Sequence, residues 1–67
     1  MSILVFDNQS VVFDGEKSVT EVLLANEINP SLVMVRVNGK VIVREQYELF
    51  IVPEGATVKV YPFVGGG

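Results

Sequence analysis

The sequence predicts an α+β fold in which one main helix packs on one face of a mixed sheet of about five strands. Three features predict it: short runs rich in β-branched residues, one capped helical segment between the second and third runs, and an Asn-Gly pair between the third and fourth. The chain has 67 residues, of which 49% are hydrophobic, so it has room for one hydrophobic core. A single helix on one face of a sheet is an economical way to form that core.

The first two strands are expected at residues 3–6 and 11–13. Turn-forming polar residues, Asp7 to Ser10, lie between them, and Asp14-Gly15 ends the second strand. Two β-rich runs joined by a short polar link are typical of a hairpin.

The helix is expected to begin at Ser18, because Ser18-Val19-Thr20-Glu21 has the form of a capping box. Val19, Val22 and Leu23 then fall on one helical face and are expected in the core. Asn29-Pro30 is expected to end the helix, since the residue before a proline is disfavoured in the α region.

Three more strands are expected at residues 32–37, 40–43 and 58–63. Asn38-Gly39 predicts a two-residue hairpin turn, in which both central residues need a positive φ. Residues 44–47 have no strand periodicity and are expected to form a loop or a single helical turn. The β-α-β connection permits a parallel pair of strands somewhere in the sheet. We expect one domain over residues 1–64, followed by a glycine tail over residues 65–67.

Composition excludes several classes of function. Without His or Cys, the chain has no Ser-His or Cys-His nucleophile pair and no zinc site of the usual kind. Its eight acidic residues lack the D-x-D spacing of a calcium loop, and its five cations are scattered, which argues against nucleic acid as a partner. The longest apolar run is four residues, too short for a membrane span, and the start does not look like a signal peptide. We therefore expect a cytoplasmic protein that binds no metal, nucleic acid or membrane and is not an enzyme.

The last three residues, Gly65-Gly66-Gly67, are the feature that most needs an explanation. Glycines without Cβ atoms let a backbone pass through a channel too narrow for side chains. Three extended residues span about 10 Å, enough to carry a terminal carboxylate into another protein's active site. A frayed end with no role is the alternative, because termini concentrate disorder.

Three segments carry a resemblance to a known family. They are Val37-Asn38-Gly39-Lys40-Val41-Ile42-Val43-Arg44-Glu45, Glu54-Gly55-Ala56, and Phe63-Val64-Gly65-Gly66-Gly67. With them the whole chain resembles the ThiS-like sulfur carriers of thiamine biosynthesis, which have the ubiquitin-like β-grasp fold. Val43 stands where the family usually has a proline, and Ala56 where it usually has a second acid.

The resemblance implies a chemistry that the partners supply. A ubiquitin-activating-enzyme-like adenylyltransferase uses ATP to adenylate the carboxylate of Gly67, while Gly65 and Gly66 enter its active site. Sulfur from a persulfide donor converts the acyl-adenylate to a thiocarboxylate, and a thiazole synthase accepts the sulfur. The carrier is the substrate in each step, binds no cofactor itself and contributes no catalytic residue.

Other functions remain open at this point. The small subunit of molybdopterin synthase also works through a terminal Gly-Gly thiocarboxylate. A protein modifier would be joined through its last glycine to lysines elsewhere. A β-grasp interaction module with an incidental tail is a third alternative, since fold alone does not fix function. The β-grasp ferredoxins are excluded, because the chain has no Cys to hold an iron–sulfur cluster.

Strand periodicity predicts a surface for docking a partner. Lys59 is expected to face water, which turns Val58 and Val60 inward and Tyr61 and Phe63 outward. The same alternation places Met34 outside with Arg36. In a ubiquitin-like arrangement the first, third and last strands are neighbours, so Leu4 is expected to join this face. The expected docking surface for the activating enzyme is thus Leu4, Met34, Tyr61 and Phe63, an apolar patch of the kind that marks interaction sites.

Overall fold

The structure is a computed structural model in which residues 1–63 are described. The expected boundary between domain and tail, after Val64, lies outside these residues. In chain order the elements, with η marking 3-10 helices, are β1 (Ser2–Phe6), β2 (Gln9–Phe13), β3 (Lys17–Ser18), α1 (Val19–Ala25), η1 (Pro30–Leu32), β4 (Val33–Val37), β5 (Lys40–Ile42), η2 (Arg44–Gln46), β6 (Ile51–Val52) and β7 (Thr57–Pro62).

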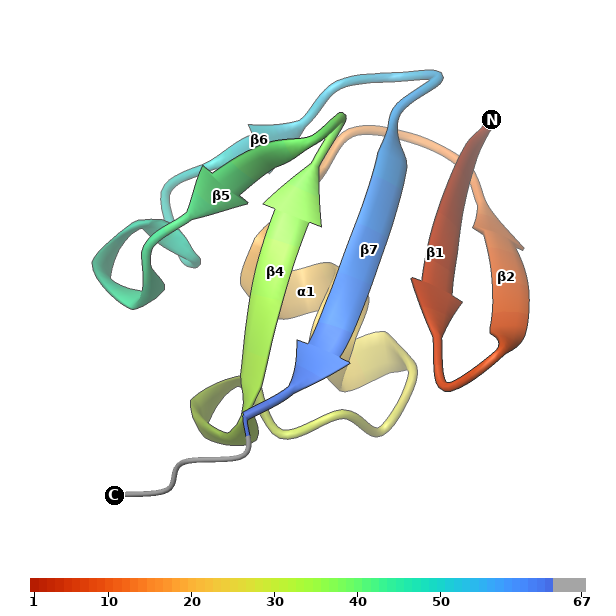
Figure 1. Cartoon of the computed structure of the whole chain (residues 1–67). Helices are drawn as coiled ribbons and strands as arrows, with labels where there is room; N and C mark the ends of the chain where they lie inside the picture. Colours follow the sequence, from red (N-terminus) through yellow and green to blue (C-terminus); the bar gives the residue numbers. More distant parts are fainter. Residues whose placement is uncertain (64–67) are drawn as a thin grey trace.

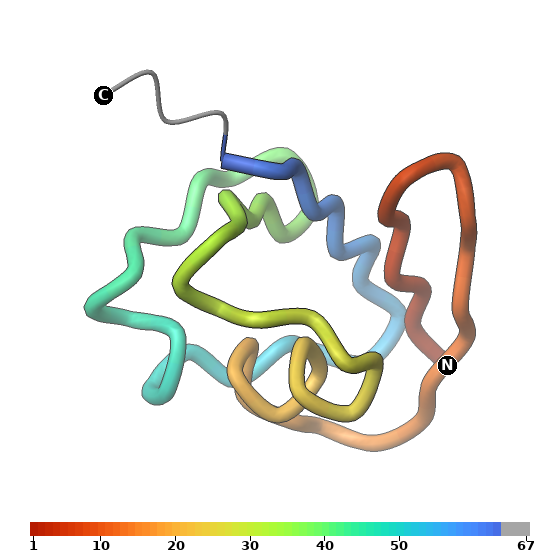
Figure 2. The backbone as a smooth tube through the Cα atoms, turned by 90° about the horizontal axis from the view of Figure 1, so that it is seen from below, coloured from red at the N-terminus to blue at the C-terminus, as the bar shows by residue number. Residues whose placement is uncertain are grey.

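The main sheet has five strands in the order β2-β1-β7-β4-β5, which confirms the predicted mixed sheet (Figure 1). β1 and β7 are parallel, and the other neighbouring strands are antiparallel. The parallel pair therefore joins the first and last strands of the chain. Helix α1 lies on one side of the sheet, as Figure 2 shows, and we call the opposite side the open face. Two short strands, β3 and β6, form a second sheet that the sequence did not predict.

Both hairpins of the main sheet close through two-residue turns with positive φ. Asn38 has φ 51° and Gly39 has φ 83°, which confirms the predicted Asn-Gly turn. Asp7 and Asn8 have φ 52° and 64° and join β1 to β2. This turn is shorter than expected, so Gln9 and Ser10 belong to β2.

Helix α1 begins where the sequence predicts. The Glu21 amide donates to Ser18 Oγ at 3.1 Å, and the Ser18 amide donates to Glu21 Oε1 at 2.9 Å, which completes the capping box. Val19, Val22 and Leu23 are buried, as expected.

The expected end of the helix at Asn29-Pro30 is wrong, because α1 ends at Ala25. The Ile28 amide donates to the Leu23 carbonyl at 2.9 Å, and the Glu27 amide donates to the Leu24 carbonyl at 3.0 Å. With Glu27 at φ 59°, these two bonds form a Schellman motif that satisfies the last carbonyls. Pro30 instead begins η1, with Asn29 as its cap.

The core lies between α1 and the sheet and is almost wholly aliphatic. Alternate residues of β4 and β7 point into it, among them Val35 and Val58, which are fully buried. Its buried members are Leu4, Val19, Val22, Leu23, Ile28, Val33, Val35, Val37, Ile42, Tyr47, Val52, Ala56, Val58 and Val60. Among residues 1–63, no helix is long and apolar enough to cross a membrane.

Candidate functional site

The three glycines proposed to carry the chemistry, Gly65, Gly66 and Gly67, lie outside the described residues. The structure does show how the chain reaches them. The Phe63 amide donates to the Leu32 carbonyl at 2.8 Å, so the last described residue is held beside the start of β4. The chain therefore leaves the main sheet at the end of β7, beside the start of the neighbouring strand β4 (Figure 1).

Three of the four residues expected on the open face are exposed. Met34 and Tyr61 lie directly opposite each other on β4 and β7, with 45% and 40% of their surfaces exposed. Phe63, two residues beyond Tyr61, is 53% exposed. The predicted alternation of β4 and β7 is therefore confirmed, while the docking role of these residues stays a prediction.

The expected exposure of Leu4 is wrong, because Leu4 is 1% exposed. It lies beside Val58 in the parallel ladder, and neighbours across a ladder share one face of the sheet. Ile3 and Val5 occupy the open face instead.

Hydrogen bonds of Ser2 explain why the residues of β1 face the opposite sides of the sheet from those expected. This residue is buried although it is polar, since its hydroxyl accepts from the Gly55 amide at 3.0 Å and donates to the Pro53 carbonyl at 3.3 Å. The run from Ile3 to Phe6 contains no polar residue, so the sequence held no signal of its phase.

An apolar hollow lies next to Phe63 and includes residues that sequence reasoning missed. Val41 and Val43 follow the Asn38-Gly39 turn and are 55% and 54% exposed. Val41 lies opposite Arg36 and therefore shares its face. Strand alternation alone was the signal that would have placed Val41 there. The hollow is lined by Val33, Met34, Val41, Ile42, Val43, Arg44, Glu45, Tyr47 and Phe63.

Two hydrogen bonds hold residues that line this hollow. The buried Tyr47 hydroxyl donates to the Val33 carbonyl at 3.1 Å. The Arg44 guanidinium donates to the Ser31 carbonyl at 3.0 Å and so ties η2 to η1. Burial raises the pKa of Tyr47 above its ordinary value of 10.0, so the hydroxyl is protonated and able to donate at neutral pH and in mild alkali. Arg44 thus has a structural contact with the residue before Leu32.

The polar side chains of Glu21 and Asn38 take part in structural hydrogen bonds. Among residues 1–63, no three acidic side chains gather where they would hold a metal ion. The backbone and hydroxyl of Ser18 lower the pKa of Glu21, and this carboxylate is occupied in capping α1. Asn38 is occupied as well, since its Oδ1 accepts from the Thr57 amide at 3.0 Å.

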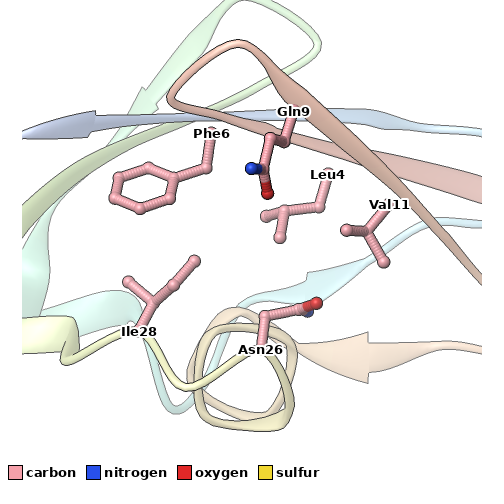
Figure 3. Close-up of a pocket in the computed structure, with 6 residues that line it drawn as sticks. All are labelled: Leu4, Phe6, Gln9, Val11, Asn26 and Ile28. Carbon is pink, nitrogen blue, oxygen red and sulfur yellow. The ribbon is translucent and has the colours of Figure 1, made fainter.

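A second hollow lies on the helix side of the sheet, between the β1–β2 hairpin and the end of α1 (Figure 3). Four of its six lining residues are apolar and two carry amide side chains, so none of these six is charged. Asn26 uses its Nδ2 to donate to the Val22 carbonyl at 2.8 Å. We assign this hollow no part in the site. Its lining residues are Leu4, Phe6, Gln9, Val11, Asn26 and Ile28.

This sheet order, with one helix on one face, defines the ubiquitin-like β-grasp class of proteins. The chain belongs to the ThiS family, whose model matches residues 3–67.

Two solved structures of a thiamine biosynthesis protein (ThiS) from Geobacter metallireducens are similar to it at 32% sequence identity. The crystal structure covers 97% of this chain and 99% of its own, with a TM-score of 0.74. The NMR structure covers 97% of this chain and 87% of its own, with a TM-score of 0.68. No significant match is found among the curated proteins.

Proposed function

We propose that this chain is a sulfur carrier of thiamine biosynthesis and that its working group is the carboxylate of Gly67. The observation that carries the proposal is the family match, which runs through residue 67 and so includes all three terminal glycines. The similarity to the thiamine biosynthesis protein along nearly the whole chain supports the same pathway. The position of β7 supports it too, since this strand ends at Pro62, shortly before the glycines in the sequence.

The chemistry follows from the properties of a carboxylate. A carboxylate oxygen attacks the α-phosphorus of ATP, and pyrophosphate leaves. The terminal sulfur of a persulfide then attacks the acyl carbon and AMP leaves, after which a thiol reduces the acyl disulfide to the thiocarboxylate. A thiazole synthase takes the sulfur. An adenylating enzyme related to the ubiquitin-activating enzymes supplies the active site, so the carrier needs no catalytic side chain of its own.

The open face is the proposed docking surface for this adenylating enzyme. Met34, Tyr61 and Phe63 are each 40–53% exposed, and Val41 and Val43 extend the same apolar surface around the hollow. Exposed apolar patches of a few hundred Å² (approximately) mark interaction sites. The surface includes Phe63, the last described residue, so a partner bound there lies close to the place where the chain leaves the sheet.

Intact-mass analysis tests the chemical step. Incubation with the adenylating enzyme of the same organism, ATP and a persulfide donor should replace one terminal oxygen by sulfur. Deleting Gly66 and Gly67 should abolish this change and leave the melting temperature unaltered, because the core is built from residues 4–60. Thiazole formation supported by the truncated chain would refute the proposal.

Two charge substitutions test the docking surface. Phe63→Asp and Met34→Glu should weaken binding of the adenylating enzyme and slow thiolation while the domain stays folded, because both side chains are about half exposed. Leu24→Glu is the matched control, since Leu24 is 59% exposed but lies on α1, away from the open face. Normal binding by both open-face variants would show that the enzyme docks elsewhere.

A further inference from the structure

Two of the five cations of this acidic chain lie directly opposite each other on the open face. Arg36 on β4 pairs with Lys59 on β7, and both side chains are exposed. Side chains directly opposite in a sheet have Cβ atoms about 4.5–5.5 Å apart, and like charges at that spacing destabilise the sheet. The isolated domain therefore carries an unfavourable contact at this position.

Nothing within the described residues neutralises this pair. Among residues 1–63, no carboxylate lies within ion-pairing distance of Arg36 or Lys59. The Arg36 guanidinium lies 5.9 Å from the centre of the Tyr61 ring, a cation–π contact that orients it but leaves its charge uncompensated. Asp7 lines a neighbouring hollow with Lys59 but forms no ion pair with it.

The pair has apolar neighbours across the sheet and toward the end of β7, while Asn38 and Thr57 lie toward its start. In one row across the sheet, Val5 lies beside Lys59 and Val41 beside Arg36. Next along the strands lie Met34 and Tyr61, which belong to the proposed docking surface. A partner that covers these residues excludes water, and charge–charge interactions strengthen when water is excluded.

We infer that Arg36 and Lys59 receive carboxylate side chains of the adenylating enzyme that activates Gly67. The inference rests on the proposed function and adds the chemistry of the partner surface, which is an apolar patch bearing Asp or Glu opposite these two cations. A carboxylate placed between them relieves the repulsion that the free domain carries. The two cations therefore lower the stability of the isolated domain and strengthen binding of the partner.

Lys59→Glu separates the two effects. In the free domain it should convert a like-charge pair into an opposite-charge pair and raise the melting temperature by about 2–4 °C. Lys40→Glu is the matched control, because it makes the same change in net charge at an exposed residue that does not face Arg36. Lys59→Met, which removes the charge and keeps the chain length, should give an intermediate melting temperature.

Binding of the purified adenylating enzyme supplies the second readout. Lys59→Glu should weaken it by about tenfold or more relative to Lys40→Glu, and wild-type binding should fall with added salt more steeply than that of Lys59→Met. If the wild-type chain is thiolated but Lys59→Glu binds as tightly as Lys40→Glu, this inference is overturned and the proposed function stands. If the wild-type chain is never thiolated, the proposed function fails and the inference falls with it.

Discussion

The hydrogen bond from the Tyr47 hydroxyl to the Val33 carbonyl is expected to stabilise the domain, and the substitution Tyr47→Phe tests it. In an antiparallel ladder, alternate pairs are hydrogen-bonded. Because Leu32 and Phe63 form such a pair, Val33 and Pro62 do not, and the Val33 carbonyl points away from β7. The Val33 carbonyl thus points to the β5 side of β4, but the last β4–β5 pair is Val35 with Ile42, so β5 has no backbone amide opposite Val33. The Tyr47 hydroxyl donates to this carbonyl in place of a strand amide.

Tyr47→Phe removes that donor and leaves the ring in place. Leaving one buried carbonyl unsatisfied costs about 1–3 kcal/mol. For a domain of this size, each kcal/mol lowers the melting temperature by about 4–8 °C, so we expect a fall of about 5–20 °C. Thermal and urea unfolding followed by circular dichroism measure it. Tyr61→Phe is the control, since Tyr61 is 40% exposed and its hydroxyl has no hydrogen-bond partner among the described residues.

The pH dependence gives the same substitution a second readout. Burial raises the pKa of Tyr47 above its ordinary value of 10.0. Stability from this group is fully present below the unfolded pKa and is lost as pH rises through the folded pKa. Wild type should therefore lose more stability above about pH 10 than Tyr47→Phe does. Equal stability of Tyr47→Phe and Tyr61→Phe at neutral pH would mean that water satisfies the Val33 carbonyl, and the reasoning would fail.

Two further predictions concern the ends of α1. Ser18→Ala should destabilise the domain by about 1 kcal/mol through loss of the cap. The pKa of Glu21 is lowered from 4.5 first by the backbone amide of residue 18, which alanine keeps, and then by the Ser18 hydroxyl, which alanine lacks. The stability that comes from the hydroxyl is present above the unfolded pKa and lost as pH falls through the folded pKa, so the difference between wild type and Ser18→Ala should shrink in acid. Glu27→Gly should stabilise by about 0.5–1 kcal/mol, because glycine adopts the positive φ of this position without strain. Glu27→Ala, which keeps the Cβ, should not stabilise, and equal unfolding midpoints for the two Glu27 variants would contradict the argument.

Sequence reasoning succeeded where a few adjacent residues decide the structure. The Ser18 capping box and the Asn38-Gly39 turn are of this kind, since each is completed by bonds or dihedral angles within four residues. It failed at the end of α1, because Glu27 adopts a left-handed conformation that usually signals itself through glycine.

Non-local contacts account for the other failures. The phase of β1 depends on bonds from Ser2 to Pro53 and Gly55, about fifty positions away in the chain. The second sheet pairs Lys17–Ser18 with Ile51–Val52, and two-residue strands have no periodicity to detect. Met34, Tyr61 and Phe63 were placed correctly because Arg36 and Lys59 fixed the phase of their strands.

The motif that carries the family resemblance acts on β7 from both of its ends. Asn38 holds the start of β7 through two hydrogen bonds. Its backbone amide donates to the Thr57 carbonyl at 2.9 Å, and its side-chain Oδ1 accepts from the Thr57 backbone amide. Arg44, from the other end of the β4–β5 hairpin, donates to the Ser31 carbonyl, and Tyr47, two residues beyond this segment of the motif, donates to the Val33 carbonyl.

These two partners flank Leu32, the residue that receives the Phe63 amide. The motif therefore fixes the direction of β7 and the point at which the chain leaves it, although Asn38 lies at the opposite end of the sheet from Phe63. A carrier that must deliver a terminal carboxylate to a partner's active site needs a fixed point of departure for its tail. We accordingly interpret these motif residues as positioning residues for the tail, which explains how they serve the proposed chemistry without touching the reacting atoms.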